Sequence, residues 1–213
     1  MDLDPVLLSR MQFAFAVSFH AIFPVFTIGL ASFIAFLETL AFRTGNPIYT
    51  RLSKFWIKVF AVVFGMGVVS GIVMSFQFGT NWSNFAQATA NFMGPVLSYE
   101  VVTAFFLEAA FLGILLFGRN KVPAGVYLFA SFMVAIGTFI SSFWILSANS
   151  WMQTPAGTVM ENGMHQVVSW SAAIFNDSFW YRFAHMGLAS FLTGSFVVAS
   201  VSAWFLLKGR EVE

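Results

Sequence analysis

Long apolar stretches without formal charge restrict the fold of this chain more than any other feature. The first runs from Met11 to Leu37 and contains no Asp, Glu, Lys or Arg. An apolar stretch of more than about 18 residues is typical of a membrane-spanning helix, because a helix satisfies its backbone hydrogen bonds internally in lipid. Only 9% of the 213 residues are charged, and the mean hydropathy is +0.81. The sequence therefore predicts an integral membrane protein.

Polar and charged residues divide the chain into five apolar segments. The first segment is too long for the apolar region of a signal peptide and follows no basic region, so we expect it to be retained as a span. The predicted fold is an all-α membrane protein in which residues 1–213 form a single transmembrane helical domain. The expected spans are 11–42, 59–77, 96–117, 124–146 and 183–207.

The basic residues are distributed unevenly between the two sides of these spans. Most follow the first, third and fifth spans, whereas Arg10 and Arg182 lie on the other side. By the positive-inside rule, we expect the N-terminus outside the cell and the C-terminus in the cytoplasm. Residues 78–95 and 147–181 then form external loops. Their tryptophans are typical of an aromatic belt at the membrane interface: Trp82, Trp151, Trp170 and Trp180.

The absence of cysteine narrows the chemistry available to this chain. Disulfides, thiolate metal sites, iron–sulfur clusters and covalently attached c-type haem all require cysteine. The sequence also contains no P-loop, no dinucleotide-binding glycine motif and no basic patch for nucleic acid. Any redox cofactor must therefore be held by His, Met, Glu or aromatic packing.

Two histidines, His20 and His185, are predicted at membrane depth on different helices. His20 follows Arg10 by ten residues, or about 15 Å of helix, and His185 lies about one turn beyond Arg182. Both positions fall in the outer half of the bilayer, and neutral imidazole is the usual nitrogen ligand of haem iron. The alternative for each histidine is a hydrogen bond to a backbone carbonyl or a hydroxyl within the bundle.

Two carboxyl groups, Glu100 and Glu108, share the third span. Eight residues of α-helix separate them by about 12 Å along the axis and about 80° around it. Carboxyl groups at membrane depth are costly and commonly mark proton paths. The alternative is a neutral carboxyl group that forms a hydrogen bond to a neighbouring helix.

Three further side chains receive weaker interpretations. Glu38 lies near Arg43 and other basic residues at the cytoplasmic end of the first span, which favours a snorkelling, salt-bridged side chain. His165 is expected to be a solvated surface histidine. Arg10 could pair with an anionic group such as a haem propionate, or could serve as an ordinary interfacial anchor.

Several segments resemble subunit I of the cytochrome bd-type quinol oxidases. They are LSRMQFAF, SFHAIFP, SFQFGTNWS, YEVVTAFFLEAAFLG, SSFWILSANSWMQTP and YRFAHM. The segments around His20, together with GMGVVSG and ANSWMQTP, are most similar to the cyanide-insensitive branch of that family. The resemblance covers essentially the whole chain, which corresponds to the N-terminal portion of a usual subunit I.

The resemblance implies roles for individual residues. It implies that His20 is an axial ligand in a high-spin di-haem site and that His185 is a ligand of a low-spin haem b. It also implies that Glu100 and Glu108 serve the di-haem site and the delivery of protons from the cytoplasm, and that Ser141 lies on the same proton route. Arg10 matches an arginine near the haem region.

The resemblance also implies cofactors, partners and an activity. The implied activity is that of a bd-type terminal oxidase subunit in the inner (plasma) membrane, which passes electrons from quinol to oxygen and takes up cytoplasmic protons. The implied cofactors are a low-spin haem b, a high-spin haem b, and haem d or a second high-spin haem b. Expected partners are the membrane, quinol, oxygen, a second oxidase subunit and a chain that supplies C-terminal spans, with no nucleic acid.

In the family, the quinol-binding loop is expected beyond the portion that this chain resembles. A methionine and a carboxylate that act as haem ligands are also expected there. We therefore expect a truncated, split or shortened form of subunit I. Two alternative functions stay open: a b-type haem electron-transfer subunit that is not an oxidase, and a subunit of a proton-coupled transporter.

Overall fold

The computed structural model describes residues 4–210 and contains five helices long and apolar enough to cross a membrane. Four are continuous α-helices, and the third span consists of α3, the π-helical turn η1 and α4. The predicted number of five spans is confirmed, and each helix is longer than its predicted span because its polar ends extend past the apolar segment. The bounds are α1 (Pro5–Thr44), α2 (Pro47–Gly79), α3 (Ser83–Glu100), η1 (Val101–Phe105), α4 (Phe106–Phe117), α5 (Ala124–Gln153) and α7 (Phe179–Leu207).

The turn between α1 and α2 shows why the first two helices separate where they do. Gly45 ends α1 in the left-handed region, with φ 66°, and its amide donates to the Ala41 carbonyl. The Asn46 side chain then caps α2 by accepting from the Ile48 amide at 3.0 Å, and Pro47 occupies the first helical position. Glycine after a helix and proline at the start of the next are the residues favoured at these positions.

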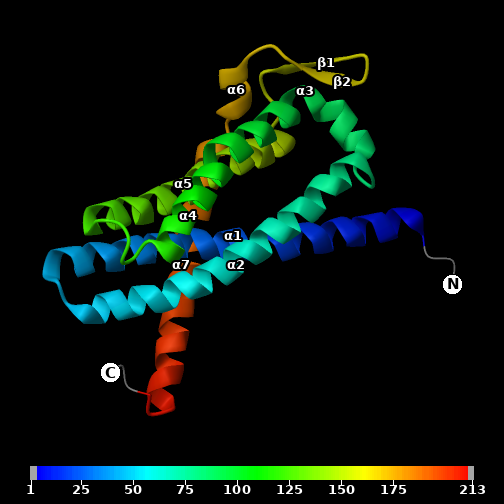
Figure 1. Cartoon of the computed structure of the whole chain (residues 1–213). Coiled ribbons are helices and arrows are strands. Elements are labelled where there is room, and N and C mark those ends of the chain that lie inside the picture. Colours follow the sequence, from blue (N-terminus) through cyan, green and yellow to red (C-terminus); the bar gives the residue numbers. More distant parts are fainter. Residues whose placement is uncertain (1–3, 211–213) are drawn as a thin grey trace.

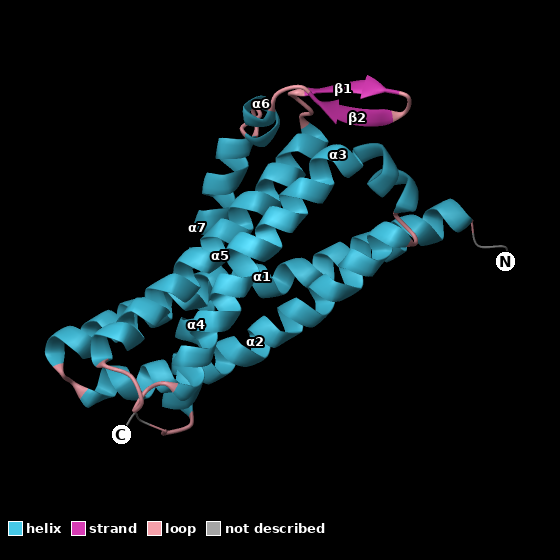
Figure 2. Cartoon of the chain, turned by 45° about the horizontal axis from the view of Figure 1, so that its top comes forward, coloured by secondary structure: helices cyan, strands magenta, loops and turns pink. Residues whose placement is uncertain are grey.

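The loops lie at opposite ends of the helical bundle (Figure 1). The α1–α2 turn and the α4–α5 loop lie toward the same end as the last turn of α7 (Phe179–Leu207), whereas β1 (Thr158–Glu161), β2 (Met164–Val167) and α6 (Trp170–Ile174) lie at the other end (Figure 2). Five crossings place the two termini on opposite sides of a membrane. The direction of insertion, with the N-terminus outside, stays a prediction.

The two segments predicted as external loops contain helices and a hairpin, so regular secondary structure replaces the expected loop conformation, and their external location stays a prediction. Residues 78–95 include most of α3, and α5 continues to Gln153 before the antiparallel hairpin β1–β2. Asn162 and Gly163 turn the hairpin with φ values of 51° and 78°. Asn-Gly is the strongest short-range hairpin signal, because a tight turn of this kind needs positive φ at both positions.

The expectation that Trp151 belongs to an interfacial belt, and that His165 is solvated, is wrong. Trp151 is only 2% exposed and packs against Phe92, with 4.6 Å between the ring centroids. His165 is half-buried, meets Trp151 edge to face and lies 3.3 Å from the Thr158 hydroxyl. The hairpin places His165 against Trp151, which belongs to a small hydrophobic core at this end of the bundle. The sequence separation of the two residues does not indicate this contact.

A second and larger core lies toward the opposite end, where α1, α2, α4 and α5 meet. Its fully buried members include Leu30, Ile34, Phe60 and Val134. These apolar side chains fill the space between the helices and carry no polar atoms that would need a hydrogen-bond partner within the membrane. The candidate functional side chains lie between and beside these two cores.

Helices α1 and α7 approach each other so closely that only small residues fit. A Cβ atom on Gly194 of α7 would lie 3.0 Å from the Gly29 Cα atom of α1. A Cβ atom on Gly29 would overlap the Ser190 carbonyl oxygen. Small residues four apart, as at Ser190 and Gly194, are typical of close helix crossings in membranes. This crossing sets the position of α7, which carries His185.

Candidate functional site

The imidazole of His20 lies against α2. Its Nδ1 atom is 2.9 Å from the Ser70 hydroxyl, and the side chain is half-buried. Gly71 leaves room for the ring, since a Cβ atom there would lie 3.3 Å from His20 Cε1. Within residues 4–210, Nε2 forms no hydrogen bond. The predicted alternative, a hydrogen bond to a hydroxyl, therefore does occur, but it occupies only one ring nitrogen.

His185 lies on the face of α7 that the other four spans leave uncovered. The side chain is exposed, as are Leu188 and Leu192, which follow it at spacings of three and seven residues with 71% and 60% of their surface accessible. No hydrogen bond to His185 is formed by the part of the chain that the structure describes. Both ring nitrogens are thus available to a group outside these five helices.

Glu100 is held by α5. The Ser141 hydroxyl donates to Glu100 Oε1 at 2.7 Å, and the carboxyl group is half-buried. This is the contact to a neighbouring helix that the sequence analysis left as an alternative to proton transfer. It also joins two residues that the family resemblance had placed on one route.

Glu108 is buried deeper in the same helix–helix interface. The residue is only 6% exposed, and its Oε1 atom has no hydrogen-bond partner among residues 4–210. Its Cγ atom packs over Gly137 of α5, where a Cβ atom would approach to 2.5 Å. A buried carboxyl oxygen without a protein partner is an exception that calls for a function or an ordered water.

The π-helical turn changes the predicted relation between the two carboxyl groups. Between Glu100 and Glu108 the amide of Phe106 donates to the Val101 carbonyl, five residues earlier. Such a turn inserts one residue into the α-helical register, so the eight residues act as about seven and the groups differ by roughly 20° rather than 80°. Both side chains therefore face α5, where Ser141 and Gly137 lie one turn apart.

Thr103 and Trp144 support this turn, and the sequence analysis did not single out either residue. The Thr103 hydroxyl donates to the Tyr99 carbonyl at 2.6 Å and accepts from the Trp144 indole at 2.9 Å. The Trp144 ring also stacks on Tyr99, with 5.4 Å between the ring centroids. The hydrogen bond therefore joins η1 to α5 next to the contact between Glu100 and Ser141.

An open apolar groove of about 610 Å³ lies beside this contact, between α5, η1 and α7. Sites for small molecules and cofactors are usually apolar and about 300–1,000 Å³ in volume. The groove resembles such sites in its apolar lining, but it is open rather than enclosed. Its lining includes Thr103, Phe139, Phe143, Trp144 and Phe183.

The structure brings only some of the predicted site residues together. Glu100 and Ser141 are in contact, and Glu108 faces the same side of α5. Within the described residues, no hydrogen bond or ion pair joins His20, His185 or Arg10 to this group. Arg10 is exposed near the start of α1, on the rim of a shallow depression.

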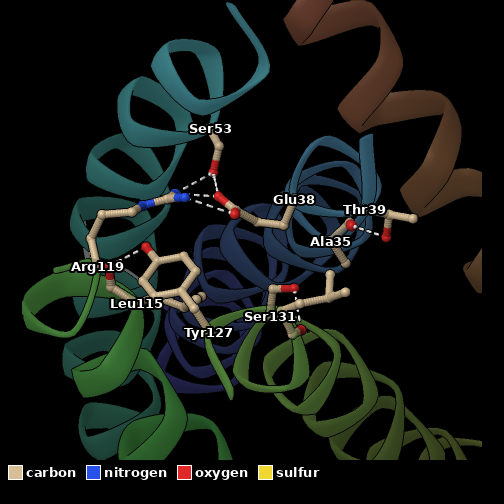
Figure 3. A network of polar contacts seen from close by, with 9 residues as sticks. Ala35, Glu38, Thr39, Ser53, Leu115, Arg119, Tyr127 and Ser131 are labelled. Carbon is tan, nitrogen blue, oxygen red and sulfur yellow. Dashed lines mark hydrogen bonds and ion pairs between the residues drawn. The ribbon is translucent and has the colours of Figure 1, made fainter. Parts of the chain in front are cut away.

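The predicted salt bridge of Glu38 is confirmed, but its partner is Arg119 rather than a neighbouring basic residue such as Arg43, and the carboxylate is buried rather than snorkelling. Glu38 is 4% exposed and pairs with both terminal nitrogens of Arg119, from the loop between α4 and α5 (Figure 3). The Ser53 hydroxyl donates to the same carboxylate, and the Arg119 guanidinium lies 4.0 Å from the centre of the Tyr127 ring. This network ties α1 and α2 to α4 and α5 at one end of the bundle.

The fold and site together define a multi-pass helical membrane protein with carboxyl groups and histidines on its candidate membrane spans. The chain belongs to the family described as cytochrome bd terminal oxidase subunit I, whose model matches residues 8–213. The family resemblance of the sequence segments is thereby confirmed. Membership of this family implies haem cofactors and a location in the plasma membrane.

Similar proteins cover nearly all of this chain. It is 39% identical to the cytochrome bd ubiquinol oxidase subunit 1 of Bacillus subtilis over 99% of its length, and 38% identical to the cytochrome bd-II ubiquinol oxidase subunit 1 of Escherichia coli over 98%. A solved bd oxidase structure from Geobacillus thermodenitrificans matches 98% of the chain with a TM-score of 0.88 at 32% identity. The chain spans only 45%, 41% and 48% of those three chains, respectively.

Proposed function

We propose that this chain is the haem-binding subunit, or part of that subunit, of a bd-type terminal oxidase that passes electrons from quinol to oxygen. The observation that carries the proposal is the pair of membrane-embedded histidines with unengaged ring nitrogens in a chain of this family. Quinol, oxygen and a second oxidase subunit are the proposed partners. Because the chain spans less than half of its relatives, we also infer a further chain or segment that supplies C-terminal spans.

The residues of this chain are suited to hold haem, each in a different way. His20 offers Nε2 from a half-buried ring that Ser70 orients, so it is the proposed axial ligand of a high-spin haem. His185 offers an imidazole on an exposed face and is the proposed ligand of a low-spin haem b. Because His185 is exposed on a face that the other four spans leave uncovered, a second ligand is expected from outside these five spans. When bound, haem iron supplies the one-electron chemistry that connects quinol oxidation to oxygen reduction.

Arg10 and the third haem complete the proposed set of cofactor contacts. Arg10 is exposed near the start of α1, where a guanidinium can pair with a haem propionate through two hydrogen bonds. The third cofactor is proposed to be haem d or a second high-spin haem b, with its ligand outside the described residues.

The carboxyl groups facing α5 support a proton route from the cytoplasmic side. Glu108 has a buried oxygen free to hold a proton or to bind water, and Glu100 accepts a hydrogen bond from Ser141 about one helical turn further along α5. A hydroxyl can accept a proton and donate one at the same time, so Ser141 is suited to relay protons between water and Glu100. In this proposal Glu108 receives the proton first and Glu100 delivers it toward the haem site.

Histidine substitutions test the proposed ligands. We expect His185→Ala to remove the absorption band of the low-spin haem from the assembled oxidase, and His20→Ala to remove a high-spin haem, because neither alanine can bind iron. His165→Ala, in the hairpin, is the matched control and should leave every band in place. The measurement is the reduced-minus-oxidised spectrum, together with a pyridine haemochrome assay.

The same samples separate the alternative functions. Unchanged spectra in both variants would refute the assignment of the ligands. A wild-type complex without haem would favour the proton-coupled transporter, and a haem complex without quinol-dependent oxygen uptake would favour the non-oxidase electron-transfer subunit.

Gly137→Ala tests the proton route. The new methyl group would lie 2.5 Å from Glu108 Cγ, so the carboxyl side chain must move away from α5. Small displacements of reacting groups can slow a reaction up to about 100-fold, and we expect proton uptake to slow at least tenfold with the haem spectra unchanged. Gly113→Ala is the control on α4, because nothing lies within 4 Å of its added Cβ atom. Uptake in Gly137→Ala at the wild-type rate would count against Glu108 as a proton carrier.

A further inference from the structure

We infer that Ser70 is a positioning residue for the haem ligand His20: its hydroxyl accepts a hydrogen bond from Nδ1 and so leaves the Nε2 lone pair free for iron. The inference rests on the proposed haem-binding function. It adds to that function a residue on α2 that makes no contact with the iron itself.

The contacts of Ser70 Oγ indicate which way its proton points. The oxygen lies 2.9 Å from the Met66 carbonyl and 3.0 Å from the Gly67 carbonyl, one turn earlier in α2, and 2.9 Å from His20 Nδ1. A hydroxyl has one proton to donate, and a carbonyl oxygen can only accept. Donation to the two carbonyls uses that proton and leaves a lone pair facing the ring. His20 then carries its proton on Nδ1.

This arrangement selects one of the two neutral forms of His20. When Nδ1 carries the proton, Nε2 is unprotonated and is the nitrogen able to bind a metal. Histidine ligands usually donate their second N–H to a neighbouring acceptor, which fixes the ring orientation and raises the basicity of the ligating nitrogen. Ser70 is the only partner of the His20 ring by hydrogen bond within residues 4–210.

Gly71 fixes the position of the His20 imidazole ring on the side that faces α2. A Cβ atom at this position would lie 3.3 Å from His20 Cε1 and 3.9 Å from Nδ1, so the imidazole rests directly on the α2 backbone. A side chain at residue 71 would push the ring by a few tenths of an ångström. Ser70 and Gly71, adjacent on α2, thus set the tautomer and the position of His20 together.

The test compares Ser70→Ala with Ser70→Thr in the assembled oxidase. Alanine removes the acceptor, whereas threonine keeps a hydroxyl on the same atom. Loss of such a partner typically weakens metal binding about 10–100-fold. We therefore expect Ser70→Ala to lose its His20-bound haem to excess apomyoglobin about 10–100-fold faster than wild type, with an altered iron–histidine band in the resonance Raman spectrum. Ser70→Thr should retain both wild-type properties.

Ser75→Ala is the matched control, because Ser75 lies on α2 and donates only to the Gly71 carbonyl. The haem held by His185 serves as an internal measure of folding in every variant. If Ser70→Ala fails to assemble, Gly71→Ala provides a second test, since the displaced ring should alter the same Raman band. The inference would be overturned if Ser70→Ala lost haem at the wild-type rate and showed an unchanged Raman band. If only Gly71→Ala assembles, an unchanged Raman band in that variant would overturn it. Retention of all haem by His20→Ala would instead refute the proposed ligand.

Discussion

Replacement of Arg119 by leucine is expected to destabilise the protein by about 3–5 kcal/mol, because the Glu38 carboxylate would stay buried without its partner. Glu38 is 4% exposed and relies on two partners, the Arg119 guanidinium and the Ser53 hydroxyl. Ser53 alone cannot balance a negative charge. The loss should also loosen the attachment of the α4–α5 loop to α1 and α2, since Arg119 is the residue that joins them (Figure 3).

Thermal unfolding of the detergent-solubilised protein measures this effect. Lys121→Leu is the matched control in the same loop, because Lys121 is exposed and its loss should change stability by no more than about 0.5 kcal/mol. A double variant, Glu38→Met with Arg119→Leu, should recover most of the stability, since a buried ion pair can often be replaced by apolar residues at little cost. Equal stability of Arg119→Leu and wild type would show that the network contributes nothing.

The five spans could be predicted from the sequence because lipid imposes a simple rule on the chain. An apolar run such as Met11 to Leu37 satisfies its backbone hydrogen bonds in a membrane by forming a helix. The Gly45–Asn46–Pro47 turn contains the residues that end one helix and begin the next. Helix ends were predicted less well. The polar ends of the helices continue past the hydrocarbon, where hydropathy no longer marks them.

The partner of Glu38 could not be predicted, because it lies 81 residues away along the chain. The sequence places Arg43 close to Glu38, but nearness along a helix end does not determine which cation turns inward. Trp151 and His165 were misjudged for a related reason: an aromatic ring near a predicted loop could lie at the interface or under a hairpin, and only the tertiary structure distinguishes the two.

Candidate site residues could be selected from the sequence, but their arrangement could not be predicted. His20, Glu100 and Glu108 stood out because polar groups are costly at membrane depth. The alignment of the two carboxyl groups depends on a π-helical turn at Val101–Phe105, whereas the predicted angle assumed a regular α-helix throughout the span. Ser70 and Gly137 were missed because serine and glycine are common in membrane helices, and only their contacts with His20 and Glu108 give them a role.

A single methyl group at the α1–α7 crossing is expected to displace α7. In Gly29→Ala the new Cβ atom would overlap the Ser190 carbonyl oxygen and lie 3.2 Å from Gly194 Cα, both backbone atoms that no rotamer change can move. Overpacking of this kind typically costs about 1–3 kcal/mol, and we expect the upper end of that range here because the helices themselves must separate. The movement should also shift His185, which α7 carries.

Gly65→Ala is the matched control for this substitution, since Gly65 is exposed on α2 and nothing lies within 4 Å of its added Cβ atom. In the middle of a helix, alanine in place of glycine should be neutral or should stabilise by up to about 1 kcal/mol. Thermal unfolding compares the two variants directly, and the absorption band assigned to the His185 haem reports on α7 alone. His185 moves only if the α1–α7 crossing opens, so Gly29→Ala should lower the stability and the absorption band of the His185 haem together. Wild-type values of both would show that the crossing stays intact and would contradict the prediction.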